Sequence, residues 1–265
     1  MKRLDSSLAV RALLVLVSAS SLAGCSAVAW QQSPRPAVST QGSAPQSAPA
    51  PSPQTSPQPS PQTSPKPNPD DAPLGRATSE PYAGDLSIFE DPERDRKLQV
   101  ERVMDVLGVG EGTGVADIGA GSGWFTVRAA RRAGTAGTVY AVEINPDYLK
   151  HIERRAGSEG LTNVKTVLGR EDDPALPERS VDAALILKTY HEIAQPVRLL
   201  RNLRRALRPG ARVGVIDREG KGDDHGVARD DVVSEAERAG YALVEEHDFV
   251  KGDGMDYLLV FRPRE

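Results

Sequence analysis

Between residues 82 and 262, short apolar runs alternate with amphipathic segments. Runs rich in Val, Ile, Leu and Ala predict buried strands at 114–118, 138–143, 164–168, 181–187 and 211–217. Apolar residues at helical spacing predict helices at 93–107, 123–133, 146–157, 195–207 and 228–239. The chain then closes with a predicted hairpin, 241–249 and 255–262. This alternation predicts an α/β fold with an open, doubly wound and mostly parallel sheet.

Proline marks several of the predicted helix boundaries. Asp91-Pro92 precedes the first helix, and Asn145-Pro146 is expected to cap and open the helix at 146–157. Pro209-Gly210 is expected to end the helix before the fifth strand. In such a sheet, ligands bind outside the carboxyl ends of the strands. The turn after the first strand is therefore the place to look for a binding site.

The first 24 residues have the pattern of a bacterial lipoprotein signal peptide. Lys2 and Arg3 precede an apolar stretch that is too short for a permanent membrane span. Leu22-Ala23-Gly24-Cys25 matches a lipobox, which predicts cleavage before Cys25 and its lipidation. With Ser26 next to the cysteine, we expect the protein in the bacterial cell envelope, outside the cytoplasm, with the outer membrane favoured over the inner.

Residues 25–81 form a predicted linker rich in Pro, Ser and Gln, with repeated Ser-Pro-Gln units. Such a composition buries too little apolar surface to fold and favours extended conformations. The sequence therefore predicts three parts: the signal peptide 1–24, the lipidated cysteine with a disordered linker 25–81, and one folded domain over 82–265.

Charge and cysteine content exclude several classes of function. The net charge is −4, and removal of residues 1–24 would leave 30 basic and 36 acidic residues, a net charge of −6. A protein of that sign is a poor candidate for general nucleic-acid binding. Cys25 is the only cysteine, and His151, His225 and His247 lack metal-ligand spacing in the sequence. We therefore expect neither an intrachain disulfide nor a metal.

The segment Asp117-Ile118-Gly119-Ala120-Gly121-Ser122-Gly123 follows the first strand and leads into a helix. Glycines there allow positive φ and close approach of a ligand to the backbone. A dinucleotide fingerprint would need glycine where Trp124 stands. The segment is instead suited to a nucleoside cofactor with a cationic amino-acid tail.

With this motif, residues 82–262 resemble the class I S-adenosylmethionine-dependent methyltransferases. The resemblance implies a Rossmann-like seven-stranded sheet that ends in an antiparallel hairpin. It also implies that the loop backbone contacts the methionine portion of S-adenosylmethionine and that Asp117 helps to hold its ammonium group. The loop residues in this expected site are Gly119, Ala120, Gly121 and Gly123.

Two further motifs carry the resemblance. Val139-Tyr140-Ala141-Val142-Glu143-Ile144-Asn145 is a strand ending in an acid, and the Glu143 carboxylate suits the two hydroxyls of a ribose. Ile144, next to it, belongs to the expected cofactor site. In Leu168-Gly169-Arg170-Glu171-Asp172-Asp173-Pro174, Arg170 stands where the family usually has an acid. Glu171 or Asp172 is therefore the candidate for adenine, with a solvated loop acid as the alternative for Asp172.

The acceptor is expected after the fourth strand, at Leu187-Lys188-Thr189-Tyr190-His191-Glu192. Leu187 completes the cofactor site. His191 is the candidate catalytic base because its intrinsic pKa lies near neutrality. Tyr190 is expected to shape the substrate pocket or to face the sulfonium with its ring. The alternative is that this segment only caps the next helix. A Gly- and Asp-rich stretch, 221–229, is a candidate flap over the substrate.

Two functions of different classes fit these features. The first is a methyltransferase that uses S-adenosylmethionine to methylate a small-molecule or cell-envelope acceptor. The second is a membrane-tethered nucleoside-binding module that keeps the fold but has no turnover, which the extracytoplasmic location would favour. A dinucleotide oxidoreductase is disfavoured by Trp124.

Overall fold

A seven-stranded mixed sheet forms the centre of the folded domain. The computed structural model describes residues 78, 82 and 84–265. The strand order is β3-β2-β1-β4-β5-β7-β6, with β7 antiparallel to both of its neighbours and the other pairs parallel. The strands are β1 (Gly114–Ile118), β2 (Thr138–Glu143), β3 (Val164–Leu168), β4 (Val181–Leu187), β5 (Leu207–Asp217), β6 (Tyr241–His247) and β7 (Tyr257–Pro263). The predicted fold, closing hairpin included, is confirmed.

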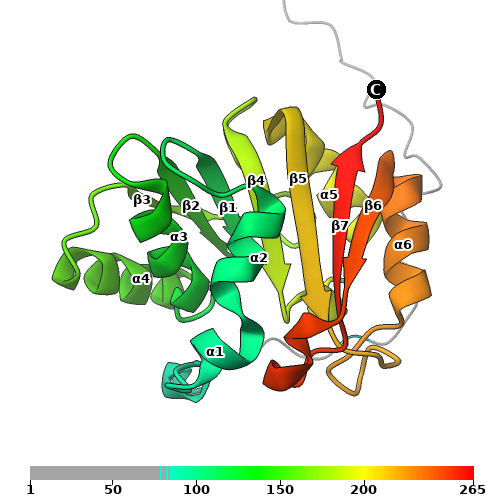
Figure 1. Ribbon diagram of the computed structural model, residues 1–265, viewed down its shortest axis with the longest axis horizontal. Helices are drawn as coiled ribbons and strands as arrows, with labels where there is room; N and C mark the ends of the chain where they lie inside the picture. Colours follow the sequence, from blue (N-terminus) through cyan, green and yellow to red (C-terminus); the bar gives the residue numbers. More distant parts are fainter. Residues whose placement is uncertain (1–77, 79–81, 83) are drawn as a thin grey trace, which may run out of the picture. The chain divides into compact units, whose positions relative to one another are not determined.

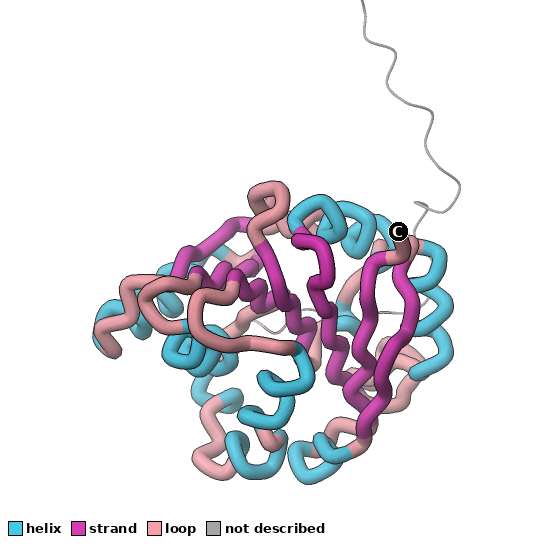
Figure 2. The backbone as a smooth tube through the Cα atoms, turned by 45° about the horizontal axis from the view of Figure 1, so that its top comes forward, coloured by secondary structure: helices cyan, strands magenta, loops and turns pink. Residues whose placement is uncertain are grey.

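Helices cover both faces of this sheet, as the two views in Figures 1 and 2 show. The α-helices are α1 (Arg94–Leu98), α2 (Val100–Leu107), α3 (Trp124–Ala133), α4 (Pro146–Ser158), α5 (Pro196–Ala206) and α6 (Arg229–Arg238). Short 3-10 segments are η2 (Leu86–Phe89), η3 (Tyr190–Glu192) and η4 (Phe249–Asp253). None of the helices in the described part of the chain is long and apolar enough to cross a membrane.

The alternation of side chains along the central strands divides the core into two layers. Val115 of β1 and Leu185 of β4 pack with α2 and α3, whereas Ala116 and Ile186 face the layer of α5 and α6. All of these side chains are at most 4% exposed. Because both faces of β1 and β4 are buried, these strands are mostly apolar, as in other parallel sheets, with one acid in each, Asp117 and Asp182. The sheet is therefore a rigid base for whatever lies at its carboxyl ends.

The prediction of one leading helix over 93–107 is wrong in one respect, because the structure has two helices there, α1 and α2. Gln99 lies between them with φ of 54°, in the left-handed region. Its side-chain Nε2 donates a hydrogen bond to the Phe249 carbonyl oxygen of η4 at 2.8 Å. Gln99 thus contacts η4, 150 residues away in the sequence. The spacing of apolar residues within 93–107 contains no sign of this contact or of the turn at Gln99.

The boundary at Pro209-Gly210 also differs from the prediction. The helix α5 ends at Ala206, and β5 begins at once with Leu207, which pairs with Val181. Pro209 and Gly210 lie within the first part of β5, where the pairing with β4 shifts its register. Proline removes a backbone donor from the ladder, which fits such an irregularity. The predicted signal peptide, Cys25 and most of the predicted linker lie outside the described residues.

Candidate functional site

A cavity of about 630 Å³ opens at the carboxyl ends of the parallel strands. Its wall includes Ile118 at the end of β1, Glu143 at the end of β2 and Leu187 at the end of β4. Arg218, directly after β5, lines it as well. This is the position at which doubly wound sheets bind their ligands, and the volume suits a small molecule.

The glycine loop between β1 and α3 forms one side of the cavity. Gly119 has φ of 70°, and a Cβ atom there would lie 2.4 Å from Thr189 Cγ2. The backbone N–H groups of Gly119 and Ala120 both donate to the Val142 carbonyl oxygen of β2, at 2.9 and 3.0 Å. Gly119, Ala120 and Gly121 line the cavity, whereas Gly123, with φ of 75°, caps the start of α3. The loop is therefore clamped to β2, with its backbone against the cavity.

Asp117 lies at the cavity wall and is 2% exposed. Its Oδ2 accepts a hydrogen bond from Thr126 Oγ1 of α3 at 2.6 Å. Burial raises the pKa of Asp117 to about 6; the hydrogen bond from Thr126 opposes this rise, and the nearby Glu143 carboxylate adds to it. A positively charged group in the cavity would favour the ionised form of this carboxyl group.

Glu143 is held by the backbone around it. Its Oε2 accepts a hydrogen bond from the Gly121 N–H at 3.0 Å, and its Oε1 accepts from Ile144 N–H at 2.8 Å and Asn145 N–H at 3.3 Å. The side chain is 9% exposed and lines the cavity. A carboxylate oriented in this way keeps acceptor capacity for ligand hydroxyls. Ile144 also lines the cavity, with 43% of its surface exposed.

The structure separates the two acids of the third motif. Glu171 lines the cavity together with Arg170 and Pro174. Asp172 is not among the lining residues, and its carboxylate forms an ion pair with Arg198 of α5 at 2.9 Å. Of the two candidates for adenine, the geometry therefore favours Glu171.

Trp124 and Arg94 add a donor and a cation that the motifs did not assign to the site. Both residues line the cavity, and the Arg94 guanidinium lies 4.4 Å from the centre of the Trp124 ring. Arg94 also forms an ion pair with Asp253 at 3.2 Å. Within the described part of the chain, the Trp124 Nε1–H is buried without a hydrogen-bond partner. A buried donor of this kind is costly unless a ligand satisfies it.

His191 lies at the other end of the cavity, with Leu187 also in the wall. Its Nδ1 atom is 2.9 Å from Asp217 Oδ2 and 3.0 Å from Asp217 Oδ1. The side chains of His191 and Asp217 are 2% and 0% exposed. Asp217 ends β5 just as Glu143 ends β2, and this strand-end acid was the signal that could have identified it from the sequence. In the tautomer whose Nδ1–H donates to this carboxylate, the Nε2 lone pair of His191 is available.

The prediction that Tyr190 shapes the pocket is wrong. Tyr190 is fully buried in the core layer of α5 and α6 and is not among the residues that line the cavity. Its hydroxyl donates a hydrogen bond to Glu235 Oε2 of α6 at 2.9 Å. In the short η3 turn, His191 and Glu192 line the cavity while Tyr190 packs behind them.

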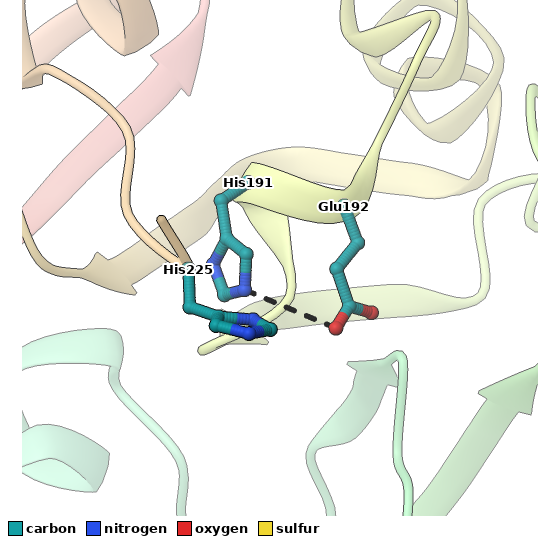
Figure 3. Close-up of side chains that lie close together, drawn as sticks. All are labelled: His191, Glu192 and His225. Carbon is teal, nitrogen blue, oxygen red and sulfur yellow. Dashed lines mark ion pairs between the residues drawn. The ribbon is translucent and has the colours of Figure 1, made fainter. Parts of the chain in front are cut away.

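Glu192 and His225 lie beside His191 at this end of the cavity, as Figure 3 shows. Glu192 Oε1 is 3.8 Å from His191 Nε2, and the imidazole rings of His191 and His225 meet edge to face at 5.8 Å. Burial raises the pKa of Glu192 to about 7; the neighbouring His191 opposes this rise, and the Glu143 and Asp217 carboxylates add to it. The candidate flap 221–229 thus contributes His225 to the cavity. No sequence pattern indicates this pairing, because the two segments are far apart along the chain.

Comparison with known proteins agrees with the resemblance. Residues 115–210 match a family described as a methyltransferase domain. The ubiquinone/menaquinone biosynthesis C-methyltransferase UbiE of Citrobacter koseri is 29% identical over 115 residues, which cover 43% of this chain and 46% of the relative. Nocamycin O-methyltransferase of Saccharothrix syringae is 29% identical over 114 residues, 43% of this chain and 41% of the relative. The matched segments thus span less than half the length of these curated relatives.

Solved structures show the same fold at low sequence identity. A SAM dependent methyltransferase from Aquifex aeolicus aligns with a TM-score of 0.60 and 24% identity, covering 68% of this chain and 98% of that one. The [4+2]-cyclase SpnF aligns with a TM-score of 0.55 and 17% identity, covering 72% and 87%. Since a protein named as a cyclase shares the fold, the fold alone does not assign the reaction. The domain match supports a methyltransferase domain over residues 115–210, in agreement with the sequence prediction.

Proposed function

We propose that this chain transfers a methyl group from S-adenosylmethionine to a small-molecule or cell-envelope acceptor. One observation carries the proposal. Asp117 and Glu143, both at most 9% exposed, stand at the ends of adjacent parallel strands and line one cavity with the glycine loop between them. The methyltransferase-domain match covers both acids and the loop.

Asp117 and Arg94, which both line the cavity, fit the two charges of an amino-acid tail. Asp117 supplies a carboxyl group for an ammonium, which favours its ionised form. Arg94 supplies a cation for a carboxylate, and the unpaired Trp124 Nε1–H would gain an acceptor. We therefore assign this end to the methionine portion of the cofactor.

The neighbouring strand end fits a nucleoside. The Glu143 carboxylate, fixed by backbone donors, is suited to bind ribose hydroxyls. Ile144 offers an exposed apolar surface that a flat base would cover. Glu171 is the acid placed to accept a hydrogen bond from an adenine amino group. The cavity thus offers a partner for each portion of S-adenosylmethionine.

We assign the acceptor to the corner formed by Leu187, His191, Glu192 and His225. When bound, S-adenosylmethionine supplies an electrophilic methyl group on a positively charged sulfur. The chain's part is then mainly alignment of the acceptor with that methyl group. Asp217 holds the His191 ring so that its Nε2 lone pair is available to the acceptor. His191 is accordingly our candidate catalytic residue.

We further propose that a lipid on Cys25 anchors the protein in the cell envelope, with the outer membrane favoured. The basic start, the apolar stretch and the lipobox support this proposal, and the linker 25–81 would separate the domain from the membrane. A Cys25→Ala variant should remain uncleaved and leave the membrane fraction. Fractionation identical to that of the unmodified chain would contradict the anchor.

Methyl transfer is tested by incubating the full chain with methyl-labelled S-adenosylmethionine and separated extracts of small molecules and envelope material. Label should appear in one class of acceptor and depend on Asp117, so an Asp117→Asn chain should transfer much less. Absence of labelled product from every extract, in a protein that binds the cofactor, would contradict turnover.

A further inference from the structure

We propose that His191, Glu192 and His225 bind a divalent transition-metal ion at the acceptor end of the cavity. One ligand atom from each residue lies within 4.8 Å of the other two. His191 and Glu192 come from η3, and His225 comes from the loop after β5 (Figure 3). Two imidazoles and a carboxylate are a set that transition-metal sites use with a further position left open.

Asp217 gives His191 the support that a metal ligand needs. Its carboxylate lies 2.9 Å from Nδ1 and also accepts hydrogen bonds from the backbone N–H groups of His191 and Arg218, at 3.2 and 3.0 Å. The ring is thereby fixed in the tautomer that keeps the Nε2 lone pair free to bind an ion. Histidines that bind metals commonly have a carboxylate in this place.

The loop that carries His225 is tied to the end of β5. Arg218 Nε donates to the His225 carbonyl oxygen at 2.8 Å, and its guanidinium also donates to the Asp224 carbonyl oxygen. An isolated bridge joins Lys221 to Val227 across the loop. His225 therefore reaches the cavity from an anchored loop, although its own side chain is at the surface end of the cluster.

The spacing requires only a small adjustment. Two atoms bound to zinc at about 2.0–2.2 Å in tetrahedral geometry lie about 3.4 Å apart. His191 Nε2 and Glu192 Oε1 are already 3.8 Å apart. A change in the side-chain torsions of the surface residue His225 would bring the third ligand into range. Magnesium is less suited, because it prefers oxygen ligands.

Two carboxyl groups accompany the imidazoles in this corner. Glu192 lines the cavity, and Asp217 contacts the His191 ring. Carboxylate oxygen and imidazole nitrogen are the ligands that zinc and related ions use together.

The role of the ion rests on the proposed methyl transfer, and in the metal-bound chain His191 Nε2 binds the ion and does not itself take the proton of the acceptor. A hydroxyl group of the acceptor that binds at the open position would lose its proton more readily, as water does on zinc. The O–H bond breaks, the proton leaves to water, and the electron pair stays on the oxygen that will receive the methyl group. The substrate class is then an acceptor with a metal-binding hydroxyl.

Calorimetry with the full chain, freed of metals with a chelator, tests the site without any assay of activity. We expect one Zn²⁺ per chain with micromolar or tighter affinity, and no binding of Mg²⁺ under the same conditions. His225→Ala should weaken Zn²⁺ binding at least tenfold, and Asp217→Asn should weaken it by roughly 10- to 100-fold. His247→Ala is the matched control, because His247 also lies beside an acid, Glu245, at 3.1 Å. It should leave the affinity unchanged.

Melting with and without Zn²⁺ provides a second readout: at the same Zn²⁺ concentration, the ion should stabilise the His225→Ala chain clearly less than the unmodified chain and the His247→Ala chain. Zn²⁺ binding that is absent, or that survives His225→Ala unchanged, would overturn the site. Titration with S-adenosylmethionine distinguishes the two proposals. Binding of the cofactor without binding of Zn²⁺ would contradict only the metal site. Binding of Zn²⁺ without binding of the cofactor would contradict the proposed function.

Discussion

The Gly121 N–H donates a hydrogen bond to Glu143 Oε2 at 3.0 Å and so joins the glycine loop to the end of β2. The two parts that we assign to the cofactor, loop backbone and ribose-binding acid, are therefore one unit. A ligand that contacts one of them contacts a surface already oriented by the other. Such preorganisation lowers the entropy cost of binding.

The buried Asp117 should make the stability of the chain depend on pH. Its pKa is about 6 in the native state and 3.8 in the reference state, so the native state holds the proton more tightly. Asp117 therefore does not lower the free energy of unfolding well below pH 3.8, where it is protonated in both states. It lowers this free energy increasingly as the pH rises from 3.8 towards about 6. The full cost is about 3 kcal/mol, since one pKa unit corresponds to about 1.4 kcal/mol.

Urea unfolding at about pH 4 and about pH 7 measures this contribution of Asp117 to the free energy of unfolding. The Asp117→Asn chain lacks the ionisable group, so it should gain stability relative to the unmodified chain as pH rises. An unchanged difference between the two chains at both pH values would contradict the native pKa of Asp117.

Gly119→Ala should destabilise the domain by about 2 kcal/mol or more, because the new Cβ meets Thr189 and the backbone has positive φ. Gly157→Ala is the matched control. Gly157 lies in α4, and a Cβ atom added there would have no neighbour within 4 Å, so alanine should stabilise the helix by about 0.5–1 kcal/mol. Chemical unfolding of both variants measures the change in the free energy of unfolding, which should be opposite in sign. Equal changes in the two variants would be inconsistent with the close contact to Thr189.

Tyr190→Phe should lower stability while leaving the affinity for S-adenosylmethionine unchanged. The change removes the 2.9 Å hydrogen bond to Glu235, which costs about 1–3 kcal/mol when a buried partner loses a bond. Tyr190 does not line the cavity, so binding should not change. Chemical unfolding and calorimetric titration of the same preparation measure the stability and the cofactor affinity. A clear loss of affinity in a fully folded Tyr190→Phe chain would contradict this placement of Tyr190 and indicate that it contributes to the pocket.

Local sequence was enough to predict most of the fold. The bounds of β1, β2, β3 and β4 agree with the predicted runs. For β1, β2 and β4 the reason is that strands buried on both faces are short, mostly apolar segments with distinct ends. The break at Gln99 and the early start of β5 at Leu207 were not predictable, since both involve contacts with distant elements. Tertiary contacts decide these boundaries.

The cofactor end of the site was easier to predict than the acceptor end. Asp117, Gly119 and Glu143 lie in compact motifs next to strand ends, and the structure places all three at the cavity. His225 reaches His191 only through the fold, and no spacing rule connects them. The direction of the Tyr190 side chain likewise depends on the η3 turn.

The most direct test is calorimetric titration of the full chain with S-adenosylmethionine, together with Glu143→Gln and a control, Glu178→Gln, at an exposed loop acid. We predict micromolar binding that the control retains and that Glu143→Gln weakens by roughly 10- to 100-fold, as expected for hydrogen bonds to a charged group. NADH should not bind. Absence of S-adenosylmethionine binding by the folded chain, or equal affinity in the Glu143→Gln chain, would contradict the proposed cofactor site.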